Sequence, residues 1–182
     1  MEGPFVNGWL TRARQVRSPN CDDRPAKASL ELVVIHTISL PPGEFGTGCV
    51  ERLFTNTLDC TAHPYFAGLK DLHVSAHFFI DRRGRLTQFV ALEARAWHAG
   101  RSCWQGREAC NDFSVGIELE GCDEQPFAEP QYLALTDLLS DLRLRMPALD
   151  AAHVVGHCDI APGRKTDPGP CFDWPRVRRG FV

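Results

Sequence analysis

The stretch SLELVVIH, residues 29–36, constrains the fold more than any other part of the chain. Its apolar and β-branched side chains follow one another almost without interruption, which is typical of a strand buried within a sheet. We therefore predict a buried strand over 29–36. That strand ends on His36 and delivers its imidazole to the carboxyl end of the strand.

Two further segments predict a β-hairpin. HVSAHFFI (73–80) and RLTQFV (85–90) flank the tetrapeptide DRRG, in which Gly84 suits a tight turn. The shorter stretch HVVGH, residues 153–157, contains two valines and a glycine and predicts a strand that runs into a turn.

The segment SVGIELEG (114–121) predicts another strand because its side chains alternate. The alternation places Ile117 and Leu119 on one face and Glu118 and Glu120 on the other. One of these two carboxylates can then point into a pocket.

Helical spacing is clearest between Gln131 and Met146, where leucines recur at intervals of three and four until Pro147 ends the pattern. We also predict a short helix over Gly8–Val16. The segment Leu40–Gly68 is expected to be a long loop with one helical turn at Val50–Phe54. Together these elements predict an α/β fold with a mixed central sheet flanked by helices.

Composition narrows the classes of protein. The 182 residues suit one domain over 1–182, with a core at about 28–175, and we expect a monomer. A net charge of −3 offers no basic footprint for nucleic acid, and no apolar run is long enough to cross a membrane. The first residues lack the pattern of a secretory signal, so we expect a cytoplasmic protein whose eight cysteines are reduced thiols.

The stretch HCDIAPGRKTDPGP, residues 157–170, holds several reactive side chains in a loop whose path proline and glycine constrain. Two imidazoles and one carboxylate from separate segments suit three protein ligands for a catalytic Zn²⁺, which would lower the pKa of a water to roughly 7. A nearby carboxylate can act as the base, and a lysine can stabilise the oxyanion. The candidates for these roles are His36, His157 and Asp167 as ligands, Glu118 as base and Lys165 as oxyanion group.

Spacing alone leaves other interpretations open. Glu118 can be a solvent-facing strand residue, Lys165 a solvated charge, and Asp167 a turn residue before Pro168. The remaining histidines are expected on the surface or as hydrogen-bonded core residues: His63, His73, His77 and His98.

Longer motifs add a resemblance. In order along the chain these are VVIHTISLPPGEFG, HPYFAGL, VSAHFFI, RAWHAG, CNDFSVGIELEG, GHCDIAPGRKTDPGP and FDW. Over nearly its whole length the chain resembles the zinc-dependent N-acetylmuramoyl-L-alanine amidases of the amidase-2 group. The resemblance implies the fold of peptidoglycan-recognition proteins and phage amidases, which is a mixed sheet flanked by helices.

The resemblance also implies roles. Matched by motif, His36, His157 and Asp167 correspond to the zinc ligands, Glu118 to the catalytic carboxylate and Lys165 to the catalytic lysine. The implied reaction is hydrolysis of the amide between N-acetylmuramic acid and L-alanine. The implied substrate is the 1,6-anhydro-muropeptide of cytoplasmic cell-wall recycling, whose removal counters induction of β-lactamase.

Contacts to the substrate are expected from Thr37, which replaces an Asn of several relatives, and from Trp97, His98 and Ala99 of the WHAG segment. Some relatives carry Arg at the positions of His73 and Ala109, so recognition of the stem peptide can differ here. Three alternatives remain: a module that binds muropeptides without cutting them, an amidase that acts broadly on intact wall, and a regulator that acts by protein contact.

Overall fold

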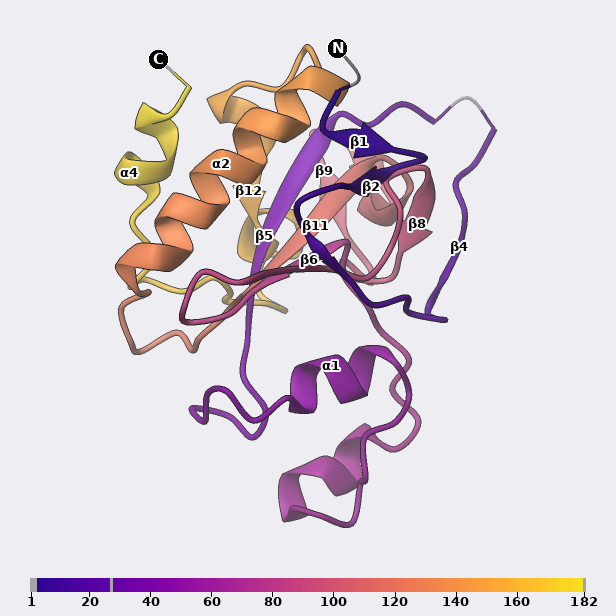
Figure 1. The fold of residues 1–182 in the computed structure, drawn as a ribbon, viewed down its shortest axis with the longest axis vertical. Coiled ribbons are helices and arrows are strands. Elements are labelled where there is room, and N and C mark those ends of the chain that lie inside the picture. The colour runs from indigo at the N-terminus through magenta and orange to yellow at the C-terminus, as the bar shows by residue number, and fades with distance from the viewer. Residues whose placement is uncertain (1–2, 27, 182) are drawn as a thin grey trace.

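A six-stranded mixed sheet forms the centre of the computed structural model, which describes residues 3–26 and 28–181 (Figure 1). Its strand order is β12-β5-β11-β6-β7-β3, and every neighbouring pair is parallel except β6 and β7. The mixed sheet with flanking helices predicted from the sequence is confirmed. The strands are β3 (Arg14–Gln15), β5 (Leu32–Ile38), β6 (Phe78–Ile80), β7 (Leu86–Gln88), β11 (Ser114–Glu120) and β12 (Val154–Gly156).

Smaller elements surround this sheet. Three antiparallel strand pairs are β1 (Phe5–Val6) with β2 (Trp9–Leu10), β4 (Cys21–Asp23) with β8 (Ala94–Ala96), and β9 (Cys103–Trp104) with β10 (Arg107–Glu108). The helices are α1 (Cys49–Phe54), α2 (Glu129–Arg145), α3 (His157–Ile160) and α4 (Trp174–Arg179), with 3₁₀ helices η1 (Pro64–Leu69), η2 (Cys110–Asp112) and η3 (Ala151–His153). Every helix within the described ranges falls short of the length and apolarity that a membrane crossing needs. All eight cysteines are free thiols.

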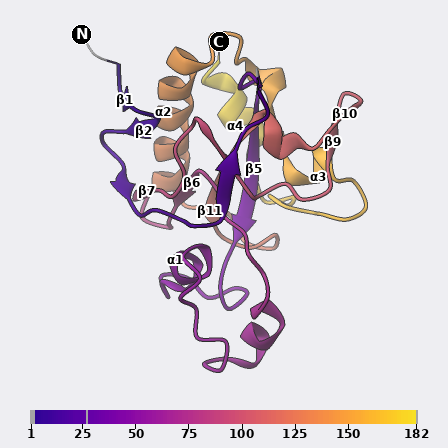
Figure 2. The same ribbon diagram turned by 90° about the vertical axis from the view of Figure 1, so that its right-hand side faces the viewer.

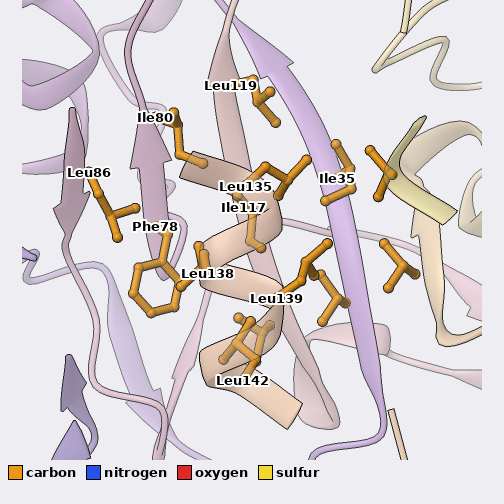
Figure 3. Close-up of a cluster of buried hydrophobic side chains, with 14 of the residues drawn as sticks. Ile35, Phe78, Ile80, Leu86, Ile117, Leu119, Leu135, Leu138, Leu139 and Leu142 are labelled. Carbon is orange, nitrogen blue, oxygen red and sulfur yellow. The ribbon is translucent and has the colours of Figure 1, made fainter. Parts of the chain in front are cut away.

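Helix α2 covers one face of the sheet, and α4 lies beside it (Figure 1). The predicted helix is confirmed, although it starts at Glu129 rather than Gln131, and Pro147 follows its end. Its inward leucines pack on sheet residues such as Ile35 and Ile117 (Figure 3). Burial of one such side chain contributes roughly 1.5–3 kcal/mol, so this face anchors the sheet. The leucines are Leu135, Leu138, Leu139 and Leu142.

The two-residue period of the strands directs the polar groups to the other face. In β5 and β11, Ile35 and Ile117 join the core beneath α2, so that His36 and Glu118, one residue further on, point to the opposite face. The parallel register sets Glu118 directly beside His36. The strand predicted over 29–36 starts later, at Leu32, and runs two residues past His36.

All seven residues of β11 are buried. The alternation left open whether Glu118 faces solvent or a pocket, but β11 lies between β5 and β6 and both of its faces are covered. Glu118 is therefore an interior carboxylate and not a solvent-facing strand residue.

The predicted helix over Gly8–Val16 is wrong. That segment forms β2 and β3, and β1 and β2 make a hairpin in which Val6 pairs with Trp9. The two residues between them, Asn7 and Gly8, have φ values of 48° and 74°. Positive φ at both central positions defines the tight turn that Asn-Gly favours, and this turn starts a β-hairpin where a helix was expected.

The predicted hairpin over 73–80 and 85–90 is confirmed, with shorter strands, β6 and β7. Between Leu40 and Gly68, the predicted helical turn is confirmed as α1, and the 3₁₀ helix η1 is an element that the sequence did not predict. Both helices lie beyond the carboxyl end of β5, away from α2 (Figures 1 and 2).

His77 gives the fold a dependence on pH. Burial, reinforced by the charge of Arg24, lowers the pKa of His77 from 6.5 to about 3. Between those pH values the unfolded chain binds one more proton than the folded chain at this site. The free energy of unfolding should therefore fall by about 1.4 kcal/mol for each pH unit of acidification below 6.5.

Urea unfolding from pH 6.5 to 4.5, with chelator present throughout, measures this dependence. His77→Gln should reduce the slope of unfolding free energy against pH by about 1.4 kcal/mol per pH unit, which corresponds to one proton. The same substitution at the exposed His73 is the matched control. Equal slopes for the native chain and His77→Gln would show that His77 carries no such linkage.

Candidate active site

A cavity of about 620 Å³ opens on the face of the sheet opposite α2, where the carboxyl ends of β5 and β11 meet. All the residues expected to act as ligands, base and oxyanion group line it, brought together from β5, β11, α3 and the loop after α3. They are His36, Glu118, His157, Lys165 and Asp167.

Three potential ligand atoms converge in this cavity. His36 Nδ1 lies 3.0 Å from His157 Nδ1 and 3.2 Å from Asp167 Oδ2, and His157 Nδ1 lies 3.1 Å from Asp167 Oδ2. His36 comes from β5, and His157 is the first residue of α3, immediately after β12. The main-chain N–H of Cys158 donates to the carbonyl of Asp167 at 3.0 Å and so fixes the loop against α3.

The protons on these rings explain why the cluster suits a cation. His157 Nε2 lies 3.1 Å from the carbonyl oxygen of Ala99, which can only accept, so Nε2 is the donor of this contact. In a neutral imidazole, a proton on Nε2 leaves Nδ1 as a lone pair, and here Nδ1 faces Asp167 Oδ2, which is also an acceptor. Burial lowers the pKa of His36 to about 4, so the His36 ring is neutral near pH 7.

The donor set fits Zn²⁺. Two imidazole nitrogens and one carboxylate oxygen are a common ligand set of catalytic zinc, and ligands about 2.0–2.2 Å from a tetrahedral ion stand about 3.3–3.6 Å apart. Among the described residues, only these three form such a cluster of ligand atoms, all within 4.8 Å of one another.

Glu118 stands beside the cluster with an unused oxygen. The residue is 9% exposed, and within the described chain its Oε2 atom has no hydrogen-bond partner. Burial raises the pKa of Glu118 well above its ordinary value, the charge of Asp167 adds to the effect, and Lys165 opposes it. In its ionised form, a carboxylate whose pKa is raised is a stronger proton acceptor for chemistry in the cavity.

Lys165 is exposed on the loop two residues before Asp167 and lines the same cavity. Its main-chain N–H donates to the carbonyl of Ala161 at 3.1 Å, which holds the loop in a defined path. The cluster thus combines a possible cation site, a base and an ammonium group, which is an arrangement suited to hydrolysis of a carbonyl compound.

Of the four residues expected to contact substrate, three line the cavity and one does not. Thr37 and Trp97 line the cavity, and the indole N–H of Trp97 donates to Asp22 at 3.1 Å. His98 also lines it, but is 8% exposed and lies behind His36, with its Nδ1 2.9 Å from His36 Nε2. Ala99 is fully buried away from the cavity, and it is its carbonyl that contacts His157.

Sequence reasoning missed two supporting groups. One is the carbonyl of Ala99, and the other is the side-chain oxygen of Asn111, which accepts from the main-chain N–H groups of His98 and Ala99 at 3.1 and 2.8 Å. A main-chain carbonyl leaves no trace in a sequence pattern. Asn111 stands in the CNDFS motif, where its residue type alone did not indicate the contact.

Comparison with known proteins agrees with this geometry. Residues 26–170 match the family model described as N-acetylmuramoyl-L-alanine amidase. The chain is 55% identical over 171 residues to the 1,6-anhydro-N-acetylmuramyl-L-alanine amidase AmpD of Citrobacter freundii, which covers 94% of this chain and 91% of that protein.

Solved structures show the same similarity. A crystal structure of a selenomethionine derivative of AmpD superposes with a TM-score of 0.94 at 53% identity, covering 98% of this chain and 99% of that one. A complex of Escherichia coli AmiD with the substrate anhydro-N-acetylmuramic acid-L-Ala-D-γ-Glu-L-Lys has a TM-score of 0.62 at 29% identity, covering 90% of this chain and 66% of that one. The family model spans the central strands of the sheet and all five residues of the candidate site. More than half of the aligned positions are identical to those of an amidase over nearly its full length. The chain therefore belongs to the family of N-acetylmuramoyl-L-alanine amidases and is an enzyme of that class.

Proposed function

We propose that the protein is a zinc-dependent amidase that hydrolyses the bond between 1,6-anhydro-N-acetylmuramic acid and L-alanine in muropeptides. The observation that carries this proposal is the meeting of three potential ligand atoms, at 3.0–3.2 Å from one another, in the cavity that also holds the unpartnered oxygen of Glu118. The names of the relatives support the substrate, since AmpD is a 1,6-anhydro-N-acetylmuramyl-L-alanine amidase and AmiD binds an anhydro-muramyl peptide.

The zinc would be held by His36 Nδ1, His157 Nδ1 and Asp167 Oδ2, with one position left for water or substrate. When bound, the ion supplies Lewis-acid chemistry, which polarises a carbonyl and acidifies a water molecule. The protein groups around it do the rest.

Glu118 accepts a proton from the attacking water as the new C–O bond forms at the lactyl carbonyl. It then returns that proton to the nitrogen of L-alanine as the C–N bond breaks, so the carboxylate ends as it began. The ammonium group of Lys165 lies on the cavity wall, where it stabilises the negative charge that develops on the carbonyl oxygen. Glu118 is paired with His36 across β11 and β5, and Lys165 is two residues from Asp167, so both groups stay close to the ligands and to the reacting bond.

The biological setting belongs to the same proposal. We place the enzyme in the cytoplasm as a monomer, with residues 1–182 as one zinc amidase domain. There it would release peptides from turnover products for reuse and remove a signal for β-lactamase induction.

Metal removal tests the proposal. Purified protein should release free tripeptide from 1,6-anhydro-N-acetylmuramyl-tripeptide, as read by mass spectrometry. Chelation should reduce release to background, and added zinc should restore it, because the ligand atoms alone offer no Lewis acid.

Two further arms separate the alternatives. The same assay with N-acetylmuramyl-tripeptide, which lacks the anhydro bond, measures preference, and equal rates would favour an amidase of broad range. A protein that binds zinc and the anhydro-muropeptide but releases no peptide would be a recognition module, and the proposed function would be wrong.

A further inference from the structure

His36 has two ring nitrogens, and only one arrangement of its proton suits a metal site. Nδ1 faces His157 and Asp167, so a ligand role requires the proton on Nε2. Nε2 in turn lies 2.9 Å from His98 Nδ1, and either nitrogen of this pair can donate. The contact between the two rings therefore leaves the position of the proton open.

The position of the proton is determined by a chain of hydrogen bonds that continues from His98 to Ser114 and the carbonyl of Cys110. The hydroxyl of Ser114 lies 2.5 Å from the carbonyl oxygen of Cys110, which can only accept, so the hydroxyl proton points there. The oxygen of Ser114 then accepts from His98 Nε2 at 3.2 Å. A neutral imidazole carries one proton, so with that proton on Nε2 the Nδ1 atom of His98 is a lone pair. His36 must then donate from Nε2, which frees Nδ1 for the metal.

The backbone around His98 is built for this contact. A side chain at Gly116 of β11 would place its Cβ 2.4 Å from His98 Cγ, so only glycine leaves room for the ring. Asn111, the neighbour of Cys110, accepts from the main-chain N–H of His98 at 3.1 Å. Two adjacent residues, Cys110 and Asn111, thus supply the carbonyl that ends the hydrogen-bond chain and position the ring of His98.

We propose that His98 is a positioning residue that, through Ser114 and the carbonyl of Cys110, sets the proton arrangement of His36 and so prepares Nδ1 as a zinc ligand. The inference rests on the metal site of the proposed function. It assigns His98 to the ligand rather than to the substrate. Loss of such a partner, one step removed from the metal, typically lowers metal affinity by about 10–100-fold.

Nitrogen-15 NMR of the histidine rings in the native, metal-free chain is the first test. The relay, meaning the hydrogen-bond chain from His36 through His98 and Ser114 to the carbonyl of Cys110, predicts a proton on Nε2 of both His36 and His98. Asp167 Oδ2, 3.2 Å from His36 Nδ1, favours the opposite arrangement when no metal is present, so the outcome discriminates. A proton on His36 Nδ1 in the metal-free protein would overturn the proposal.

Zinc affinity, measured by competition with a chelator, is the second test. His98→Leu should raise the Kd for zinc by about 10–100-fold, and His98→Gln, whose amide can both accept and donate, should recover most of that loss. Native affinity in His98→Leu contradicts the proposal. Both readouts are independent of hydrolysis, so a chain that binds zinc as expected but cuts nothing would refute the proposed function and not this one.

Ser114→Ala tests the far end of the hydrogen-bond relay. This substitution should raise the Kd for zinc and leave His36 with its proton on Nδ1 in part of the molecules and on Nε2 in the rest. Ser18→Ala is the matched control, because Ser18 is also buried and donates to a carbonyl, that of Phe54, at 2.5 Å, but lies outside the relay. Equal zinc affinities for the two serine variants would count against the relay, and the native NMR measurement decides the matter if His98→Leu does not fold.

Discussion

Replacement of Glu118 by glutamine should lower the kcat for hydrolysis of the 1,6-anhydro-muramyl amide by about 10²–10⁴-fold. Glutamine keeps the size of the side chain but cannot take a proton from water. Zinc affinity should stay close to native because Glu118 lies beside the three ligand atoms and is not one of them. Single-turnover hydrolysis together with zinc titration measures both quantities.

Glu120→Gln is the matched control for this experiment. Glu120 is also buried, two residues along the same strand and on the same face, but its oxygens accept from the main-chain N–H groups of Gly46 and Arg82. This substitution should cost about 1–3 kcal/mol of folding free energy and leave kcat near the native value. A Glu118→Gln enzyme that retains more than about a tenth of the native kcat would exclude Glu118 as the general base.

Replacement of Arg24 by methionine should lower the free energy of unfolding by about 3 kcal/mol, because it leaves several carbonyl oxygens without a charged donor. The guanidinium of Arg24 donates to four main-chain carbonyls at 2.9–3.1 Å, and burial lowers its pKa to about 10. These carbonyls belong to Leu92, Asn111, Asp112 and Ser114.

Thermal and urea unfolding measure the effect, which corresponds to a fall in Tm of roughly 6–12 °C for a chain of this size. Arg24→Lys should lose much of the same stability because one ammonium group cannot reproduce the planar fork of donors. Arg14→Met is the control, since Arg14 pairs with Glu51 on the surface, and it should cost about 1 kcal/mol or less. Equal losses at the two positions would mean that the buried carbonyls find other partners.

Local patterns predicted the elements whose residues make their contacts within a few positions. The spacing of the leucines predicted α2, the β-branched run predicted β5, and Gly84 predicted the turn between β6 and β7. The wrong helix over Gly8–Val16 has the same origin, because Asn7–Gly8 is a local turn signal that specifies a β-hairpin there.

The candidate site was nominated from residue types and motifs, but its geometry depends on contacts between distant parts of the chain. His36 and Asp167 are 131 positions apart, and His98 reaches His36 over 62. No spacing rule covers such distances, so the role of His98 behind the ligand, rather than at the substrate, emerged only from the folded chain.

By itself the sequence determined the class of fold, the family and the identity of the reactive side chains, because strand period, helix spacing and motifs are local properties of a chain. Tertiary structure alone decided that Glu118 is buried, since that depends on β5 and β6 pairing with both edges of β11. It also decided which nitrogen of each histidine faces the ligand cluster, because Nε2 of His157 contacts the carbonyl of Ala99 and Nε2 of His36 contacts the ring of His98. Burial and hydrogen-bond direction are set by neighbours in space, and those neighbours are remote in sequence.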